Sequence, residues 1–165
     1  MSRKLNFNSF KLSGRFAAFA AALGVFLMIS SSVSAAGRCQ IVYGHYVEHQ
    51  VTTNCNSLCI EGEYFGAVRG TFSGAVTQLY PPEGAIVTLF NSESIIHANV
   101  AGKSGDLLIK NSGAVHFAGD GDIVDLQLIT GGTGDFAGAT GAIRASGTFV
   151  NGSGDSNYEG TICTP

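Results

Sequence analysis

The 165-residue sequence has no tryptophan and only three prolines, and none of its twelve acidic residues precedes residue 37. Four of its nine Lys and Arg residues lie before that point, which leaves five basic against twelve acidic residues, a net charge of −7, for residues 37–165. Charge therefore excludes a basic nucleic-acid surface and opposes binding to an anionic membrane. The low proline content and the lack of a G-X-Y period argue against proline-rich disorder and collagen.

No apolar run reaches the roughly 20 residues needed to span a bilayer. The longest, residues 16–29, has 14 residues, follows a basic segment and precedes small residues of the Ser34-Ala35-Ala36 type. This order is typical of a cleavable signal peptide. We predict a signal peptide over 1–36, a single domain over 37–165, and a secreted or periplasmic product with no stable membrane insertion after cleavage.

Cysteine usage agrees with export. The four cysteines are Cys39, Cys55, Cys59 and Cys163. In a secreted chain they indicate two disulfides, for which three pairings exist. We expect Cys39 to pair with Cys163, joining the first strand to the last, and Cys55 to pair with Cys59 across a local loop. Zinc is the alternative, but the C-x3-C spacing lacks a second close pair of ligands. We predict no metal and no cofactor.

Glycine is abundant, with 21 residues after position 36, more than twice its usual share of about 7%. Turn-forming clusters separate eight segments rich in β-branched and aromatic residues, near 40–53, 64–80, 85–99, 105–110, 113–118, 122–130, 141–150 and 157–163. No window after residue 36 carries a helical apolar stripe, so the domain is all-β, preceded by a helical signal peptide. Eight antiparallel strands fit a closed up-and-down barrel or a sandwich. The barrel is favoured because it leaves no exposed edge and brings Cys39 beside Cys163.

The first strand segment contains His45-Tyr46-Val47-Glu48-His49, which matches the H-x-x-E-H zinc-protease pattern. Two histidines four residues apart share a metal on a helix, where they stand about 6 Å apart. On a strand they are roughly 13 Å apart and do not. We therefore interpret Tyr43, His45 and His49 as candidate ligand-binding residues along one strand rather than as metal ligands.

Glu93 and His97 are candidate catalytic residues. They alternate with apolar residues on one side of the predicted strand over 85–99, and an acid and an imidazole on an interior face would act as acid/base groups. The opposite side of this strand is equally apolar, so the pattern does not decide which face points inward.

A family resemblance rests on the second half of the chain. Its residues are the stretch from Ile129 to Gly141 (ITGGTGDFAGATG), Gly147-Thr148-Phe149, Tyr158-Glu159-Gly160-Thr161 and, upstream, Gly105–Lys110 with Gly113-Ala114. This pattern resembles the allene oxide cyclase-like barrels, specifically bacterial secreted members, whose wider relatives include the dirigent proteins. The resemblance covers about 105–163 well and 40–100 weakly. It implies an eight-stranded antiparallel barrel with a hydrophobic interior, and it makes a homo-oligomer plausible.

Relatives of that kind cyclise an epoxide, direct phenoxy-radical coupling or close rings in natural products, each by holding an apolar molecule inside the barrel. The matching motif is a turn, so it implies the fold and not catalytic residues. We expect an exported barrel that binds a small apolar or amphipathic ligand. The alternatives are an isomerase or cyclase acting by shape control, and a non-catalytic envelope or surface protein with a filled barrel.

Overall fold

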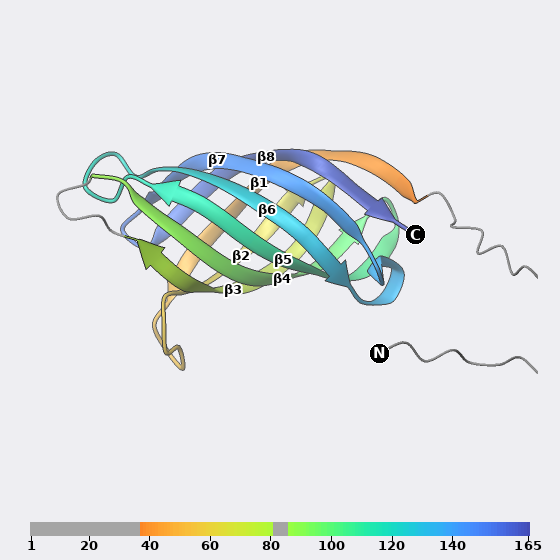
Figure 1. Cartoon of the computed structure of the whole chain (residues 1–165), viewed down its shortest axis with the longest axis horizontal. Coiled ribbons are helices and arrows are strands. Elements are labelled where there is room, and N and C mark those ends of the chain that lie inside the picture. Colours follow the sequence, from red (N-terminus) through yellow and green to blue (C-terminus); the bar gives the residue numbers. More distant parts are fainter. Residues whose placement is uncertain (1–36, 81–85) are drawn as a thin grey trace, which may run out of the picture. The chain divides into compact units, whose positions relative to one another are not determined.

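The computed structural model describes residues 37–80 and 86–165, and the predicted signal peptide lies outside them. Eight antiparallel strands form a closed barrel in which each strand pairs with its neighbours in sequence and β1 pairs with β8 (Figure 1). The elements are β1 (Arg38–Val51), β2 (Cys59–Gly66), β3 (Val68–Tyr80), β4 (Thr88–Val100), β5 (Lys103–Val115), β6 (Asp122–Gly132), the 3-10 turn η1 (Gly134–Phe136), β7 (Thr140–Val150) and β8 (Ser153–Thr164). The predicted all-β barrel is confirmed. Within the two described ranges, no helix is long and apolar enough to span a membrane.

The seam between β1 and β8 carries the predicted long-range disulfide. Cys39 lies directly opposite Cys163 in the strand register, and their sulfurs are bonded. Cys55 and Cys59 form the second disulfide, between the loop after β1 and the start of β2. Both expected pairings are confirmed. Two disulfides are compatible with an extracellular or periplasmic protein.

The predicted number of strands is correct, but two segment assignments are wrong and compensate each other. The segment 64–80 contains a turn, because β2 ends at Gly66, whose φ of +107° disfavours side chains, and β3 starts at Val68. The segments 105–110 and 113–118 are not separate strands, since β5 runs through both and ends at Val115. Gly113 is therefore part of a continuous strand, and glycine is required there because a Cβ would collide with the ring of Phe90.

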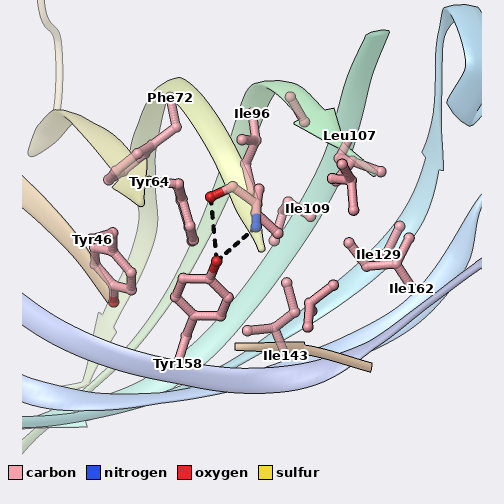
Figure 2. Close-up of a cluster of buried hydrophobic side chains, with 14 of the residues drawn as sticks. Tyr46, Tyr64, Phe72, Ile96, Leu107, Ile109, Ile129, Ile143, Tyr158 and Ile162 are labelled. Atoms are coloured by element: carbon pink, nitrogen blue, oxygen red, sulfur yellow. Dashed lines mark hydrogen bonds between the residues drawn. The ribbon is translucent and has the colours of Figure 1, made fainter. Parts of the chain in front are cut away.

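Alternate residues of every strand point into the barrel, where they form two apolar clusters. The first cluster lies toward the end of the barrel where η1, the start of β1 and the end of β8 are found. It includes Phe136 of η1, which is only 1% exposed. Figure 2 shows one side of the cluster formed by rings and the other by aliphatic side chains: Tyr46, Tyr64, Phe72 and Tyr158 face Leu107, Ile129, Ile143 and Ile162. The second cluster, at the opposite end, consists of Val76, Phe90, Val115 and Phe149.

Tyr158 ties β8 to the turn between β2 and β3. Its hydroxyl oxygen accepts a hydrogen bond from the backbone N–H of Val68 at 2.9 Å. The hydroxyl proton lies within reach of the carbonyl oxygen of Phe65 at 3.2 Å and of that of Val68 at 3.3 Å. Figure 2 shows the two contacts with the Val68 backbone. Because Tyr158 is buried inside the first cluster, this hydroxyl satisfies backbone groups that water does not reach.

Candidate functional site

Polar side chains separate the two apolar clusters across the barrel interior. Along β6, Asp125 and Gln127 are the inward residues between the clusters. Along β4 this position is taken by Ser92, and along β5 by Asn111. The whole set, which we name the interior polar layer, is Tyr46, Glu48, Tyr64, Ser92, Asn111, Asp125, Gln127 and Ser156. Six of the eight strands contribute to it, so the closed barrel itself brings these residues together.

Hydrogen bonds connect three members of this layer. The hydroxyl of Tyr64 donates to Oε1 of Gln127 at 2.8 Å, and Nε2 of Gln127 donates to Oδ2 of Asp125 at 3.0 Å. Three buried atoms of the layer have no hydrogen-bond partner among the described residues: the other carboxylate oxygen of Asp125, Oδ1, the amide oxygen of Asn111 and the hydroxyl oxygen of Ser156. Buried acceptors without a partner are uncommon in folded proteins and call for a physical explanation.

The two carboxyl groups of the layer have raised pKa values. Glu48 is 9% exposed and Asp125 is 7% exposed. Burial, and secondarily the charge of Asp125, raises the pKa of Glu48 from 4.5 to about 7. Burial raises the pKa of Asp125 from 3.8 to about 6, although the hydrogen bond from Gln127 partly opposes this shift. Near neutral pH the pKa of each carboxyl group therefore lies within about one unit of the pH.

The tyrosines beside these carboxyl groups stay protonated. Burial raises the pKa of Tyr46 far above its ordinary value of 10.0, and the charges of Glu48 and Asp125 raise it further. Burial also raises the pKa of Tyr64, and the neighbouring Tyr46 and Asp125 add to this effect. Both hydroxyls are therefore hydrogen-bond donors at any physiological pH.

Two small cavities meet at Glu48. The inner cavity, about 30 Å³, is bordered by the interior polar layer, including Glu48, Asn111 and Asp125. The mouth cavity, also about 30 Å³, is bordered by Glu48 and otherwise by apolar side chains, among them Leu79 and Phe117. These two apolar residues are about half exposed, 45% and 50%, so the mouth cavity lies at the barrel surface. Glu48 thus stands between an apolar entrance and a polar interior.

The structure places the sequence-predicted site residues on the outside of the barrel. Glu93 is exposed and its carboxylate lies 3.1 Å from the amine of Lys110. His97 is exposed and its Nδ1 lies 2.7 Å from Oδ1 of Asp106. The face of β4 that carries Glu93 and His97 is therefore the outer face.

The candidate ligand-binding residues on β1 also point outward. Tyr43 is 70% exposed, and His45 stacks on Phe65 with ring centroids 4.9 Å apart. His49 borders an outer depression of about 550 Å³ that His97 also borders. The structure thus brings His49 and His97 to the same surface depression, but neither histidine lines an interior cavity.

Sequence reasoning missed the residues that do meet inside. Glu48 is the glutamate of the H-x-x-E-H match, and it lies on the opposite face of β1 from His45 and His49. The period of two along β1 carries the signal that groups Glu48 with Tyr46 and Val42. In β6 the signal is Asp125-x-Gln127 within an otherwise apolar strand, since two polar residues on one face of such a strand require buried partners or solvent.

Comparison of the chain with known proteins finds no matching family model and no matching curated sequence. The resemblance to allene oxide cyclase-like barrels stays a prediction. In the described residues, no group of three or more histidine, cysteine, aspartate or glutamate side chains is placed to hold a metal ion.

Proposed function

We propose that this protein is an exported barrel that binds a small amphipathic molecule at the mouth end of its interior. The apolar part of the molecule lies in the mouth cavity, and its polar head enters the inner cavity. The observation that carries this proposal is the position of Glu48, a nearly buried carboxyl group that borders both cavities. Ligand sites commonly combine apolar walls with a few converging polar groups, which is the composition found here.

The energetics of the polar layer support a binding role. Burying a carboxyl group without a cation is unfavourable, and the barrel buries two, Glu48 and Asp125, in one layer. Apolar residues of similar size at these positions would stabilise the barrel. Perturbed carboxyl groups beside a cavity are typical of functional sites.

Export is part of the proposal. The basic, apolar and small-residue order of 1–36 predicts a cleaved leader, and the two disulfides are compatible with an oxidising compartment. Mass spectrometry of the protein purified from its native host tests this point. We expect a chain that begins near residue 36 or 37, and a chain that retains its first 30 residues contradicts export by signal-peptide cleavage.

Displacement of an apolar fluorescent dye, combined with native mass spectrometry, tests ligand binding. We expect aliphatic alcohols, terpenoid alcohols and phenols to displace the dye from the wild-type protein. Phe117→Trp narrows the mouth cavity and should weaken displacement, whereas Phe65→Trp on the outer surface is the matched control. Failure of every compound to bind, or equal weakening by both variants, counts against an interior site.

Proton transfer is a second candidate function, favoured by the pKa of about 7 at Glu48. A general acid/base works best when its pKa is near the working pH. In such an isomerase, the Glu48 carboxylate would remove one proton from the ligand and return it at another carbon. Conversion of β,γ-unsaturated ketones to their conjugated isomers is the assay. Glu48→Gln should abolish it, and the outer-surface double variant Glu93→Gln/His97→Ala should leave it unchanged.

The competing hypothesis is an envelope or surface protein whose barrel is filled by its own side chains and binds no ligand. The small size of the interior cavities favours it. Each is about 30 Å³, whereas sites for drug-sized ligands measure roughly 300–1,000 Å³. Only a small head group fits inside unless the mouth residues move. Absence of binding in the dye and mass-spectrometry experiments would favour this role.

A further inference from the structure

We propose that the head group of the ligand is a protonated primary amine, held by Glu48, Asp125 and Asn111. This inference deepens the proposed function and rests on it. It starts from the two unpartnered buried atoms of the inner cavity, Oδ1 of Asp125 and Oδ1 of Asn111, both of which are hydrogen-bond acceptors. Asp125 is more than nine-tenths buried, so water from outside does not freely satisfy it.

Two donors of the layer are already used: the Tyr64 hydroxyl donates to Gln127, and the Gln127 amide donates to the other oxygen of Asp125. The unpartnered oxygens of Asp125 and Asn111 and the carboxyl group of Glu48 remain as acceptors at the inner cavity, so a molecule that brings donors finds partners there. A carboxylate or phosphate ligand brings only acceptors and a charge of the wrong sign.

Charge points to the same class of molecule. None of the five Lys and Arg residues in the described part of the chain borders either interior cavity. Among the described residues, Glu48 and Asp125 thus have no cationic partner. An ammonium group inside the cavity would favour the ionised form of both carboxyl groups and offset their burial.

Size and valence fit an ammonium group. A cavity of about 30 Å³ accommodates roughly two water-sized groups, since one water needs about 10–15 Å³. A primary ammonium has three N–H donors, and the cavity offers three acceptors: the Glu48 carboxylate and the two unpartnered oxygens. The carbons next to the ammonium would lie in the apolar mouth cavity, which begins at Glu48, and the rest of a longer alkyl chain would extend past the half-exposed Leu79 and Phe117 to the barrel surface.

Three probes of equal chain length test the inference: hexylamine, hexanol and hexanoate. Each is titrated at pH 7.5 and 150 mM salt into the disulfide-bonded barrel domain, residues 37–165, with the side-chain amide signals of Gln127 and Asn111 followed by NMR. We expect hexylamine to bind at least tenfold more tightly than hexanol and hexanoate to give no shift. Hexanol or hexanoate binding as tightly as hexylamine overturns the amine inference but leaves interior binding intact. Absence of interior shifts with all three probes overturns both proposals.

Isosteric variants separate the site from the general attraction of amines to an acidic protein. The double variant Glu48→Gln/Asp125→Asn should bind hexylamine and hexanol within threefold of each other, while hexanol affinity stays close to that of the wild type. Glu63→Gln removes an exposed carboxylate on the outer side of β2 and should keep the amine preference. If the double variant is poorly folded by circular dichroism, Glu48→Gln alone is used, and retention of the full tenfold preference overturns the inference.

Discussion

Gln127 donates a hydrogen bond from Nε2 to Oδ2 of Asp125, two residues earlier on the same strand, at 3.0 Å. Residues two apart on a strand share a face, so both side chains enter the barrel. The Oε1 atom of the same glutamine accepts the hydroxyl proton of Tyr64 from β2. One amide therefore satisfies two buried polar groups from opposite parts of the barrel.

Replacement of Gln127 by leucine should destabilise the barrel and raise the pKa of Asp125. Gln127→Leu leaves two buried groups without partners, and each such group costs about 1–3 kcal/mol. The pKa of Asp125 should rise further above 6, because the hydrogen bond from Gln127 lowers it. Urea unfolding and carbon NMR titration of the carboxyl groups measure both effects. Gln78→Leu, at an exposed position on β3, is the control, and an unchanged Asp125 pKa in Gln127→Leu contradicts the assigned hydrogen bond.

The stability of the barrel should fall as pH rises from about 4.5 to 7. In this range the folded state retains the proton of Glu48, whose pKa is about 7, while the unfolded state releases it near 4.5. The slope of unfolding free energy against pH is therefore negative, and stability levels off above pH 7. Asp125 adds a further decrease in the free energy of unfolding between about pH 3.8 and pH 6.

Glu48→Gln isolates the contribution of Glu48. The shift corresponds to on the order of 3 kcal/mol, so the variant should be more stable than the wild type above pH 7 by up to that amount and similar at pH 4. Guanidinium unfolding at several pH values provides the measurement. The exposed carboxyl groups of Asp106 and Asp120 have lowered pKa values, so their titration changes the stability only at more acidic pH. A pH-independent difference between wild type and Glu48→Gln would show that Glu48 is not titrating inside the barrel.

Much of the fold was predictable because it follows from local patterns and from the cysteines. Turn clusters and β-branched segments predicted an antiparallel barrel, and the position of Cys39 and Cys163 in the first and last strands predicted the seam. The break between β2 and β3 was missed because the turn at Gly66 is short and lies within an aromatic, β-compatible stretch. Asn111 and Gly113 were interpreted as a turn, although they are inward residues of β5.

The candidate site was not predictable from hydropathy because β6 reverses the usual rule. Val124, Leu126 and Leu128 point outward and are each more than half exposed, at 56%, 54% and 52%. The alternate face, with Asp125 and Gln127, points inward. A pattern of apolar and polar residues alone assigns these faces the wrong way round. Only the pairing of β6 with β5 and β7, which depends on residues far away in the sequence, decides the orientation.

The two disulfides should differ in their contribution to stability. In the chain-entropy model, a cross-link stabilises more when it closes a longer loop of the unfolded chain. Cys39 and Cys163 are 124 residues apart, and Cys55 and Cys59 are four apart. We expect Cys39→Ser/Cys163→Ser to lose about 5 kcal/mol and Cys55→Ser/Cys59→Ser about 2 kcal/mol in urea unfolding. Equal losses would mean that the seam is held by strand pairing rather than by the cross-link.

Removal of the Tyr158 hydroxyl should lower the free energy of unfolding of the barrel without creating a cavity in its core. Tyr158→Phe keeps the ring in the first cluster but leaves the buried N–H of Val68 without its acceptor at 2.9 Å. An unsatisfied buried donor costs about 1–3 kcal/mol, and the loss should concentrate at the turn between β2 and β3. Hydrogen exchange should show faster exchange of the Val68 amide than in the wild type. Tyr43→Phe changes a 70% exposed ring on β1 and should alter stability by less than about 0.5 kcal/mol. Equal stability of the two variants would indicate that water replaces the hydroxyl at Val68, and that this end of the barrel is open to solvent.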